Sequence, residues 1–132
     1  LKMSTLKVNT IQNTSAAHSS TPEQIAQGRA KAWCHFTVSS GTPSIDDSFN
    51  ISSITDNNAG DFTFNFATAM ANTNYAPLST SEVGSGNITT AQLVNGGSAT
   101  ASVRIQYFQI QTLDGGGNDV DPAAGAVAVF GD

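Results

Sequence analysis

The sequence predicts an all-β protein, an antiparallel β-sandwich of about seven strands preceded by a short N-terminal stem and helix. Apolar and polar residues alternate with a period of two in several segments, as in "DFTFNF" at residues 61–66. Clusters of glycine, asparagine and proline separate these segments at short intervals. Only 11% of the residues are charged, and the polarity comes instead from 15 Ser, 15 Thr, 11 Asn and 7 Gln, a composition typical of folded all-β domains rather than of disordered chains.

Length and charge exclude several classes of function. A chain of 132 residues is long enough for one domain and short for two. The net charge of −5 argues against a nucleic-acid partner, because phosphates attract clustered Lys and Arg, and against an anionic membrane surface. The longest strictly apolar run, residues 126–130, is too short to cross a membrane, so we expect no membrane insertion. The chain opens on Leu1 without a Met, and we expect it to be part of a longer protein.

Residues 1–19 form a stem whose apolar positions are separated by polar or small residues. These positions are Leu1, Met3, Leu6, Val8 and Ile11. Nineteen residues cannot bury such a row by themselves, so the stem must lie on the domain or on other chains. We therefore divide the chain into a stem at residues 1–19 and a head domain at residues 20–132.

A short helix is predicted at about residues 22–27. Thr21 suits the N-cap, Pro22 suits the first helical position, and Gln24 stands three residues after Thr21, as in a capping box. Gly28 can end the helix. A helix of this length is marginal without packing against other elements.

The rest of the chain is predicted to be strands. In "KAWCHFTV", residues 31–38, Cys34 is expected to be a buried small hydrophobe, while His35 points to the opposite face. "SFNISSI" and "DFTFNF" flank the glycine-containing turn "DNNAG", which predicts a β-hairpin. Pro77 indicates that "YAPLSTSEV" is an edge strand or contains a bulge.

Three further strands complete the prediction. "NITTAQLV" is followed by a Gly-Gly pair, and "AVAVFGD" closes the chain. "SVRIQYFQIQTL" is expected to be the longest strand, with Val103, Ile105 and Tyr107 on one face. The row Phe62, Phe64 and Phe66 must also face something apolar, and we expect it to face the interior of this domain.

Some segments suggest chemistry of their own, but each has a simpler interpretation. "LDGGGNDVD", residues 113–121, resembles a glycine-rich calcium-binding repeat, yet those repeats work in stacks and this copy is alone, so we favour a loop between two strands. The adjacent Asp46 and Asp47 could be half of a glycosidase pair, but they more often cap a turn. His18 and His35 are too far apart to suggest a metal pair. We therefore expect no catalytic residue, metal or cofactor.

Four segments occur in an order and spacing that resembles the C-terminal region of bacteriophage tail-fibre proteins. They are "STLKVNTIQNTS", "PEQIAQGRAKAW", "DSFNISSITDNNAGDFTFNF" and "VAVFGD". The resemblance covers residues 4–36, 47–70 and 126–132, nearly half of the chain, and does not extend to residues 71–125. It implies a homotrimer at the distal end of a virion's tail fibre, which attaches the phage to host polysaccharide or outer-membrane protein. In such a trimer Leu6, Val8 and Ile11 of three copies would meet on a common axis.

Two polar segments are the candidates for contact with the receptor, because function in β scaffolds usually lies on loops. The first comprises Asp114, Asn118, Asp119 and Asp121, and the second comprises Glu82 and Asn87. Both lie outside the resemblance, and their oxygens and amides are suited to hydrogen-bonding sugars. The resemblance thus implies a receptor-binding head, and we expect it to be non-catalytic. Two alternatives stay open: a depolymerase that cuts the polysaccharide it binds, and a purely structural trimerisation module at the fibre tip.

Overall fold

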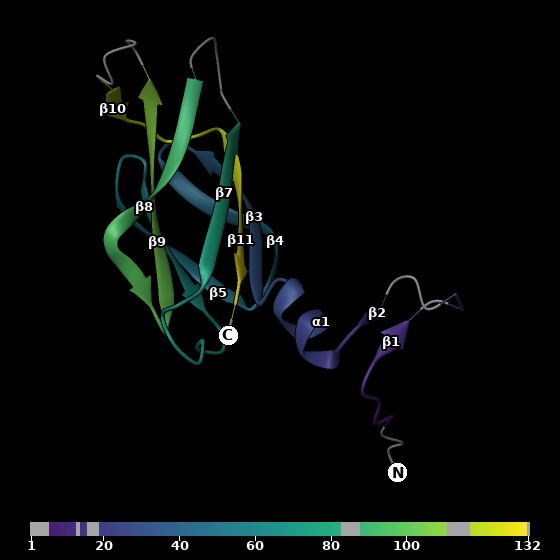
Figure 1. Ribbon diagram of the computed structural model, residues 1–132. Helices are drawn as coiled ribbons and strands as arrows, with labels where there is room; N and C mark the ends of the chain where they lie inside the picture. The colour runs from purple at the N-terminus through teal and green to yellow at the C-terminus, as the bar shows by residue number, and fades with distance from the viewer. Residues whose placement is uncertain (1–5, 13, 16–18, 83–87, 111–116, 132) are drawn as a thin grey trace.

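The protein is almost entirely β in the computed structural model, which describes residues 6–12, 14–15, 19–82, 88–110 and 117–131 (Figure 1). The described part contains one helix, α1 (Pro22–Gly28), and eleven strands. The strands are β1 (Ile11–Gln12), β2 (Ser19–Ser20), β3 (Ala32–Ser39), β4 (Thr42–Phe49), β5 (Ile51–Asn58), β6 (Asp61–Phe66), β7 (Ala76–Glu82), β8 (Ile88–Ala99), β9 (Ser102–Ile110), β10 (Gly117–Asp119) and β11 (Ala124–Phe130).

Nine of these strands form two antiparallel sheets, as the all-β prediction required. The four-stranded sheet has the order β4-β3-β11-β7. The five-stranded sheet has the order β10-β9-β6-β5, and β8 pairs with β9. Because β6 and β8 pair with the same residues of β9, they lie on opposite sides of it. β1 and β2 form a separate two-stranded ladder near the N-terminus.

The chain passes from one sheet to the other at Asn50, inside a segment predicted to be a single strand. Asn50 has a φ of 56°, in the left-handed region that asparagine tolerates better than most residues. Its side-chain amide donates to the carbonyls of Lys31 and Thr68, both at 3.1 Å, and its side-chain oxygen accepts from the Thr68 amide at 2.7 Å. This corner separates β4 from β5, which is one reason why there are more strands than expected.

One hydrophobic core lies between the two sheets and contains the phenylalanine row. Phe62 and Phe64 are fully buried, and Phe66 is 8% exposed. Phe36 of the four-stranded sheet contacts both Phe62 and Phe64 edge-on, with ring centroids 5.9 and 5.3 Å apart. The prediction that this row faces the protein's own interior is confirmed.

Other local predictions had mixed outcomes. β5 and β6 form the predicted hairpin, and Pro77 lies in β7, an edge strand of its sheet. Val103, Ile105 and Tyr107 are buried on one face of β9 as expected. However, the longest described strand is β8 with 12 residues, not β9 with nine, because β8 continues past its glycine pair through a register shift between Leu93 and Ser98.

The helix begins as the sequence indicates. Gln24 N donates to Thr21 Oγ1 at 3.1 Å, and Thr21 N donates to Gln24 Oε1 at 2.9 Å, which completes the capping box. Helix α1 ends one residue later than predicted, at Gly28, and Arg29 after it is extended. None of its seven residues is buried.

Replacing Phe64 with Ala should lower the free energy of unfolding by roughly 3–5 kcal/mol, because a fully buried ring is lost and a cavity remains. Thr63, its neighbour on the opposite face of β6, provides the control, and Thr63→Ala should cost about 1 kcal/mol. Chemical denaturation measures both values. Equal stability of the Phe64→Ala and wild-type proteins would contradict the core assignment.

Candidate functional site

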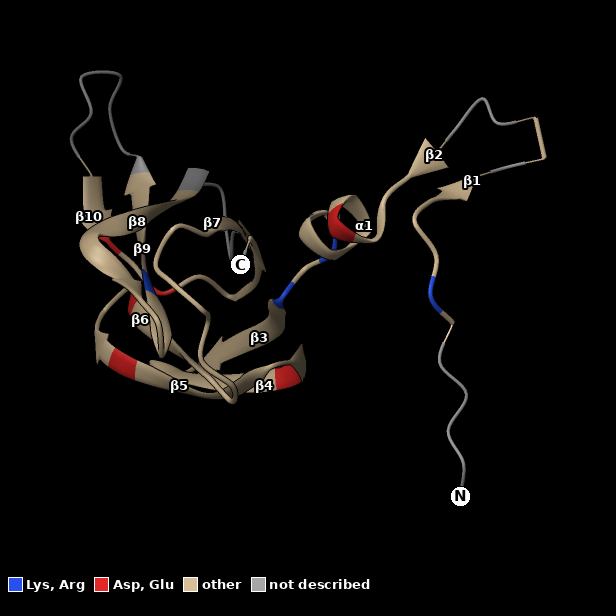
Figure 2. Cartoon of the chain, turned by 60° about the horizontal axis from the view of Figure 1, so that its bottom comes forward, with Lys and Arg blue, Asp and Glu red and all other residues tan. Residues whose placement is uncertain are grey.

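The two ends of the molecule differ, and three of the candidate receptor residues lie at one of them. The N-terminal arm (the described residues 6–12, 14–15 and 19–20) and α1 project from one end of the β body (Figures 1 and 2). The C-terminal end of β7, the start of β8, the end of β9 and the start of β10 lie at the opposite end (Figure 1). We call this the distal end. Glu82, Asn118 and Asp119 belong to these strand termini.

The structure divides the predicted receptor residues into three groups: exposed residues, residues outside the described part of the chain, and Asp121. Asn118 and Asp119 are exposed, but they lie in β10, where they pair with Gln109 and Phe108. The prediction that residues 113–121 form a simple loop is therefore wrong for its second half. Glu82 is exposed at the last position of β7. Asp114 and Asn87 lie outside the described residues.

Asp121, the third group, has a structural role in the folded domain. It is partly buried, and its Oδ1 accepts a hydrogen bond of 2.7 Å from the backbone amide of Gly60. Gly60 lies in the turn between β5 and β6, 61 residues away in sequence. The sequence prediction placed Asp121 among the receptor contacts because its carboxylate oxygens suit hydrogen bonds to sugars. Nothing in the sequence indicated that this carboxylate binds the Gly60 amide. The structure leaves Asn118 and Asp119 as the exposed polar pair of this segment.

The Gly60 turn also holds β10 in place. Tyr107 in β9 donates its amide to the Gly60 carbonyl at 2.6 Å, and its own carbonyl accepts from the Val120 amide at 3.2 Å. β10 therefore continues the line of β6 along β9. Tyr107 itself is fully buried, and its hydroxyl bonds to Ser79 Oγ at 2.6 Å. Asn118 and Asp119 are thus presented by a strand that is fixed to the core.

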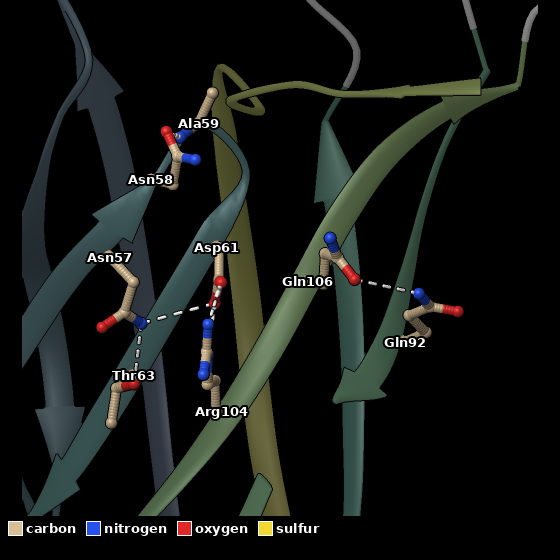
Figure 3. Close-up of polar contacts among 8 residues, drawn as sticks. All are labelled: Asn57, Asn58, Ala59, Asp61, Thr63, Gln92, Arg104 and Gln106. Carbon is tan, nitrogen blue, oxygen red and sulfur yellow. Dashed lines mark hydrogen bonds and ion pairs between the residues drawn. The ribbon is translucent and has the colours of Figure 1, made fainter. Parts of the chain in front are cut away.

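The outer face of the five-stranded sheet carries a polar network (Figure 3). Arg104 donates to both oxygens of Asp61, with a distance of 2.7 Å from Nε to Oδ1. Asn57 donates to Asp61 at 3.3 Å and to Thr63 at 2.9 Å. The hydrogen bond from Arg104 holds the pKa of Asp61 below its ordinary value. These groups satisfy one another, which favours a stabilising role for the network.

The outer face of the four-stranded sheet carries the histidine–aspartate contact. His35 Nδ1 lies 3.0 Å from Asp46 Oδ2, and Thr37 Oγ1 donates to Asp46 Oδ1 at 3.2 Å. Asp46 and Asp47 lie inside β4, at a register shift opposite His35 and Phe36, so the prediction that they cap a turn is wrong. An irregular strand position brings Asp46 to the histidine, and the sequence has no signal for it.

Cys34 lies on the opposite face of β3 from His35, as alternation predicted. Its side chain is buried, and burial raises the pKa of its thiol to about 11. The thiol is therefore protonated at neutral pH and is not an activated nucleophile. The adjacent His35 cannot serve as its base, because it projects from the other side of the sheet.

The apolar residues of the N-terminal arm are not covered by the head. Leu6 is 84%, Val8 38% and Ile11 54% exposed. Together with α1 they line an open groove of about 620 Å³. Its apolar lining residues are Leu6, Val8, Ile11, Pro22, Ile25 and Ala26. The arm and helix thus expose apolar surface to whatever lies beside them.

Within the described residues, no group of three or more His, Cys, Asp or Glu side chains is arranged to hold a metal ion. In the same part of the chain, no helix has the length and apolar character needed to span a membrane. Some residues of the segment 113–121 that resembles a calcium-binding repeat, including Asp114, lie outside the described residues. Neither a protein-family model, nor a curated protein, nor a solved structure matches the chain.

Gly60→Ala should destabilise the head and disturb β10. Gly60 has a φ of 68°, and a Cβ there would lie 2.3 Å from the Tyr107 carbonyl oxygen and 2.8 Å from Val120 backbone atoms. Gly96 has a similar φ of 71° with no atom within 4 Å of the added Cβ, so Gly96→Ala isolates the backbone strain of about 1–2 kcal/mol. Thermal melting should show a clearly larger decrease in melting temperature for Gly60→Ala than for Gly96→Ala. An equal decrease in melting temperature for the two variants would mean that the backbone at Gly60 is not packed as described.

Proposed function

We propose that this chain is the receptor-binding head of a bacteriophage tail fibre, a β-sandwich that acts as a homotrimer in the virion and has no catalytic activity. The observation that carries the proposal is the difference between the two ends of the molecule. Apolar residues are exposed at the stem end, and polar residues on fixed strands are exposed at the distal end. The resemblance of "STLKVNTIQNTS" and the later segments to tail-fibre proteins supports the same assignment.

The stem end supports assembly. A helix of seven residues is far below the roughly 12–15 residues that a helix needs to persist in water, and α1 buries none of its residues. Leu6, Val8 and Ile11 are equally uncovered. Three copies wound about one axis would shield these side chains from water and supply the packing that one chain lacks.

The distal end supports recognition of a host surface glycan or protein. Asn118, Asp119 and Glu82 offer hydrogen-bond donors and acceptors that neighbouring groups of the core do not cover. Because β10 is fixed to β9 through the Tyr107 and Val120 backbone atoms, little conformational entropy is lost on binding. Three copies of the site would strengthen a weak sugar contact by avidity.

The purified chain should have a mass near 41 kDa by light scattering at micromolar concentration, three times the 13.6 kDa of one chain. Removing residues 1–19 should shift the population toward monomer, because Leu6, Val8 and Ile11 are then lost. A mass near 13.6 kDa for the whole chain would contradict the homotrimer.

The double substitution Asn118→Ala and Asp119→Ala should reduce adsorption of the protein to host cells while leaving the oligomer mass and melting temperature unchanged. Asp56→Ala, which removes an exposed carboxylate from β5, serves as the control. Adsorption is measured by the depletion of fluorescently labelled protein from a cell suspension. Unchanged adsorption of the double variant would remove this strand from the site and direct attention to Glu82.

Adsorption and a separate measurement of reducing sugar together distinguish the alternative functions. Release of reducing sugar from host polysaccharide would identify a depolymerase. A folded trimer that does not adsorb to any host surface would identify a structural module. Loss of adsorption only after treatment with a chelator would support the calcium interpretation of residues 113–121.

A further inference from the structure

The outer faces of the two sheets are chemically different. The five-stranded sheet presents hydroxyl and amide groups and the Arg104–Asp61 pair, as Figure 3 shows in part. The four-stranded sheet presents an apolar row that crosses all of its strands. In this row Phe49 of β4 is paired with Trp33 of β3, Trp33 with Ala128 of β11, and Ala128 with Leu78 of β7. We call these four residues the outer apolar row.

The outer apolar row is exposed in the single chain. Phe49 is 55%, Leu78 62% and Trp33 36% exposed. A shallow hollow of about 230 Å³ lies between Trp33 and Leu78, with Ala126 and Ala128 among its lining residues. The four side chains contribute nothing to the core, which lies on the other face of the sheet. Large aromatic and aliphatic side chains gathered in this way mark a contact surface rather than a solvated one.

The row has a polar border on the side away from the stem. Next to it along the strands lie Asp47, His35, Ala126 and Thr80, so three of these four positions are polar. Thr37 and Glu82 follow, on either side of Ala124. The Asp46 carboxylate bridges His35 and Thr37 in this border. An apolar centre beside a polar rim is the usual organisation of a protein–protein interface.

The row also adjoins helix α1. Gln27 of α1 lines one cavity together with Ala76 and Phe130, which lie at the stem-side ends of β7 and β11. Ala76 and Phe130 are paired, two residues before Leu78 and two after Ala128, and so share the outer face with the row. The groove of the arm, helix α1 and the outer apolar row therefore form one connected surface.

We propose that the outer apolar row is the surface through which the head domains of neighbouring copies of this chain contact each other. This inference rests on the proposed homotrimer and adds to it, because it assigns the four-stranded sheet to the interior of the assembly and the polar sheet to its exterior. A second copy is the occupant because the row is continuous with the arm, and the arm's own residues need the same partner. A membrane surface is disfavoured by the net charge of −5.

Trp33 is the only tryptophan in the chain and lies within the row, so its fluorescence reports directly on the contact. In the whole wild-type chain, measured at a concentration where light scattering gives a trimer, Trp33 should be protected from acrylamide quenching. Leu78→Asp should weaken association at least tenfold, because it places a charge in an apolar contact, and should make Trp33 accessible. Gln92→Asp, which places the same charge on the outer face of β8, should change neither property.

The outcomes separate this inference from the proposed trimer. A trimer in which Trp33 is quenched as fully as in the denatured chain would overturn the head–head contact and leave trimerisation by the stem intact. A wild-type monomer would overturn the homotrimer itself. Leu78 is an exposed residue of an edge strand, so its substitution should not unfold the head. Circular dichroism checks this, and the wild-type quenching result decides the question if the variant is unfolded.

Discussion

The contact of Phe36 with Phe62, Phe64 and Tyr107 is the interaction on which the rest of the structure depends. One ring from the four-stranded sheet touches three rings of the five-stranded sheet, with centroids 5.3–5.9 Å apart and the ring planes inclined by 62–68°. Edge-on pairs of this kind add to the free energy of apolar burial. Gly125 makes the contact possible, since a Cβ at that position would lie 2.7 Å from the Phe36 ring. Because side chains alternate along a strand, placing Phe36 inside also places Trp33 and His35 outside.

Much of this inner face could be predicted from the sequence. The alternation in residues 31–38 and 61–66 identifies Cys34, Phe36 and the phenylalanine row as buried, and the structure buries them. The start of the helix could also be predicted, because Thr21, Pro22 and Gln24 form a local capping pattern. The corner at Asn50 was missed, because an asparagine between two apolar residues looks like one more alternating position. Only its bonds to Lys31 and Thr68, from two other parts of the chain, show why it turns there.

The candidate sites were harder to predict because they depend on register. Asp121 and Asp119 are two residues apart and looked equivalent in the sequence, yet one binds the Gly60 amide and the other is exposed at the distal end. The outer apolar row joins positions 33, 49, 78 and 128, and its members become neighbours only when four strands pair in one register. Alternation could indicate that Trp33 faces away from the core, but it could not show that Phe49 and Leu78 lie in the same row.

The same alternation that builds the core thus leaves two outer faces free to differ. On the five-stranded sheet Thr63, Asn65 and Arg104 hydrogen-bond to neighbouring strands, and such a surface is stable in water without a partner. The outer apolar row has no comparable internal compensation, since Phe49 and Leu78 are more than half exposed. Under the proposed head–head contact, Phe49 and Leu78 would be removed from water by the corresponding face of another copy. If the apolar face and the arm are used for assembly, the polar distal end remains accessible, and assembly does not compete with receptor binding.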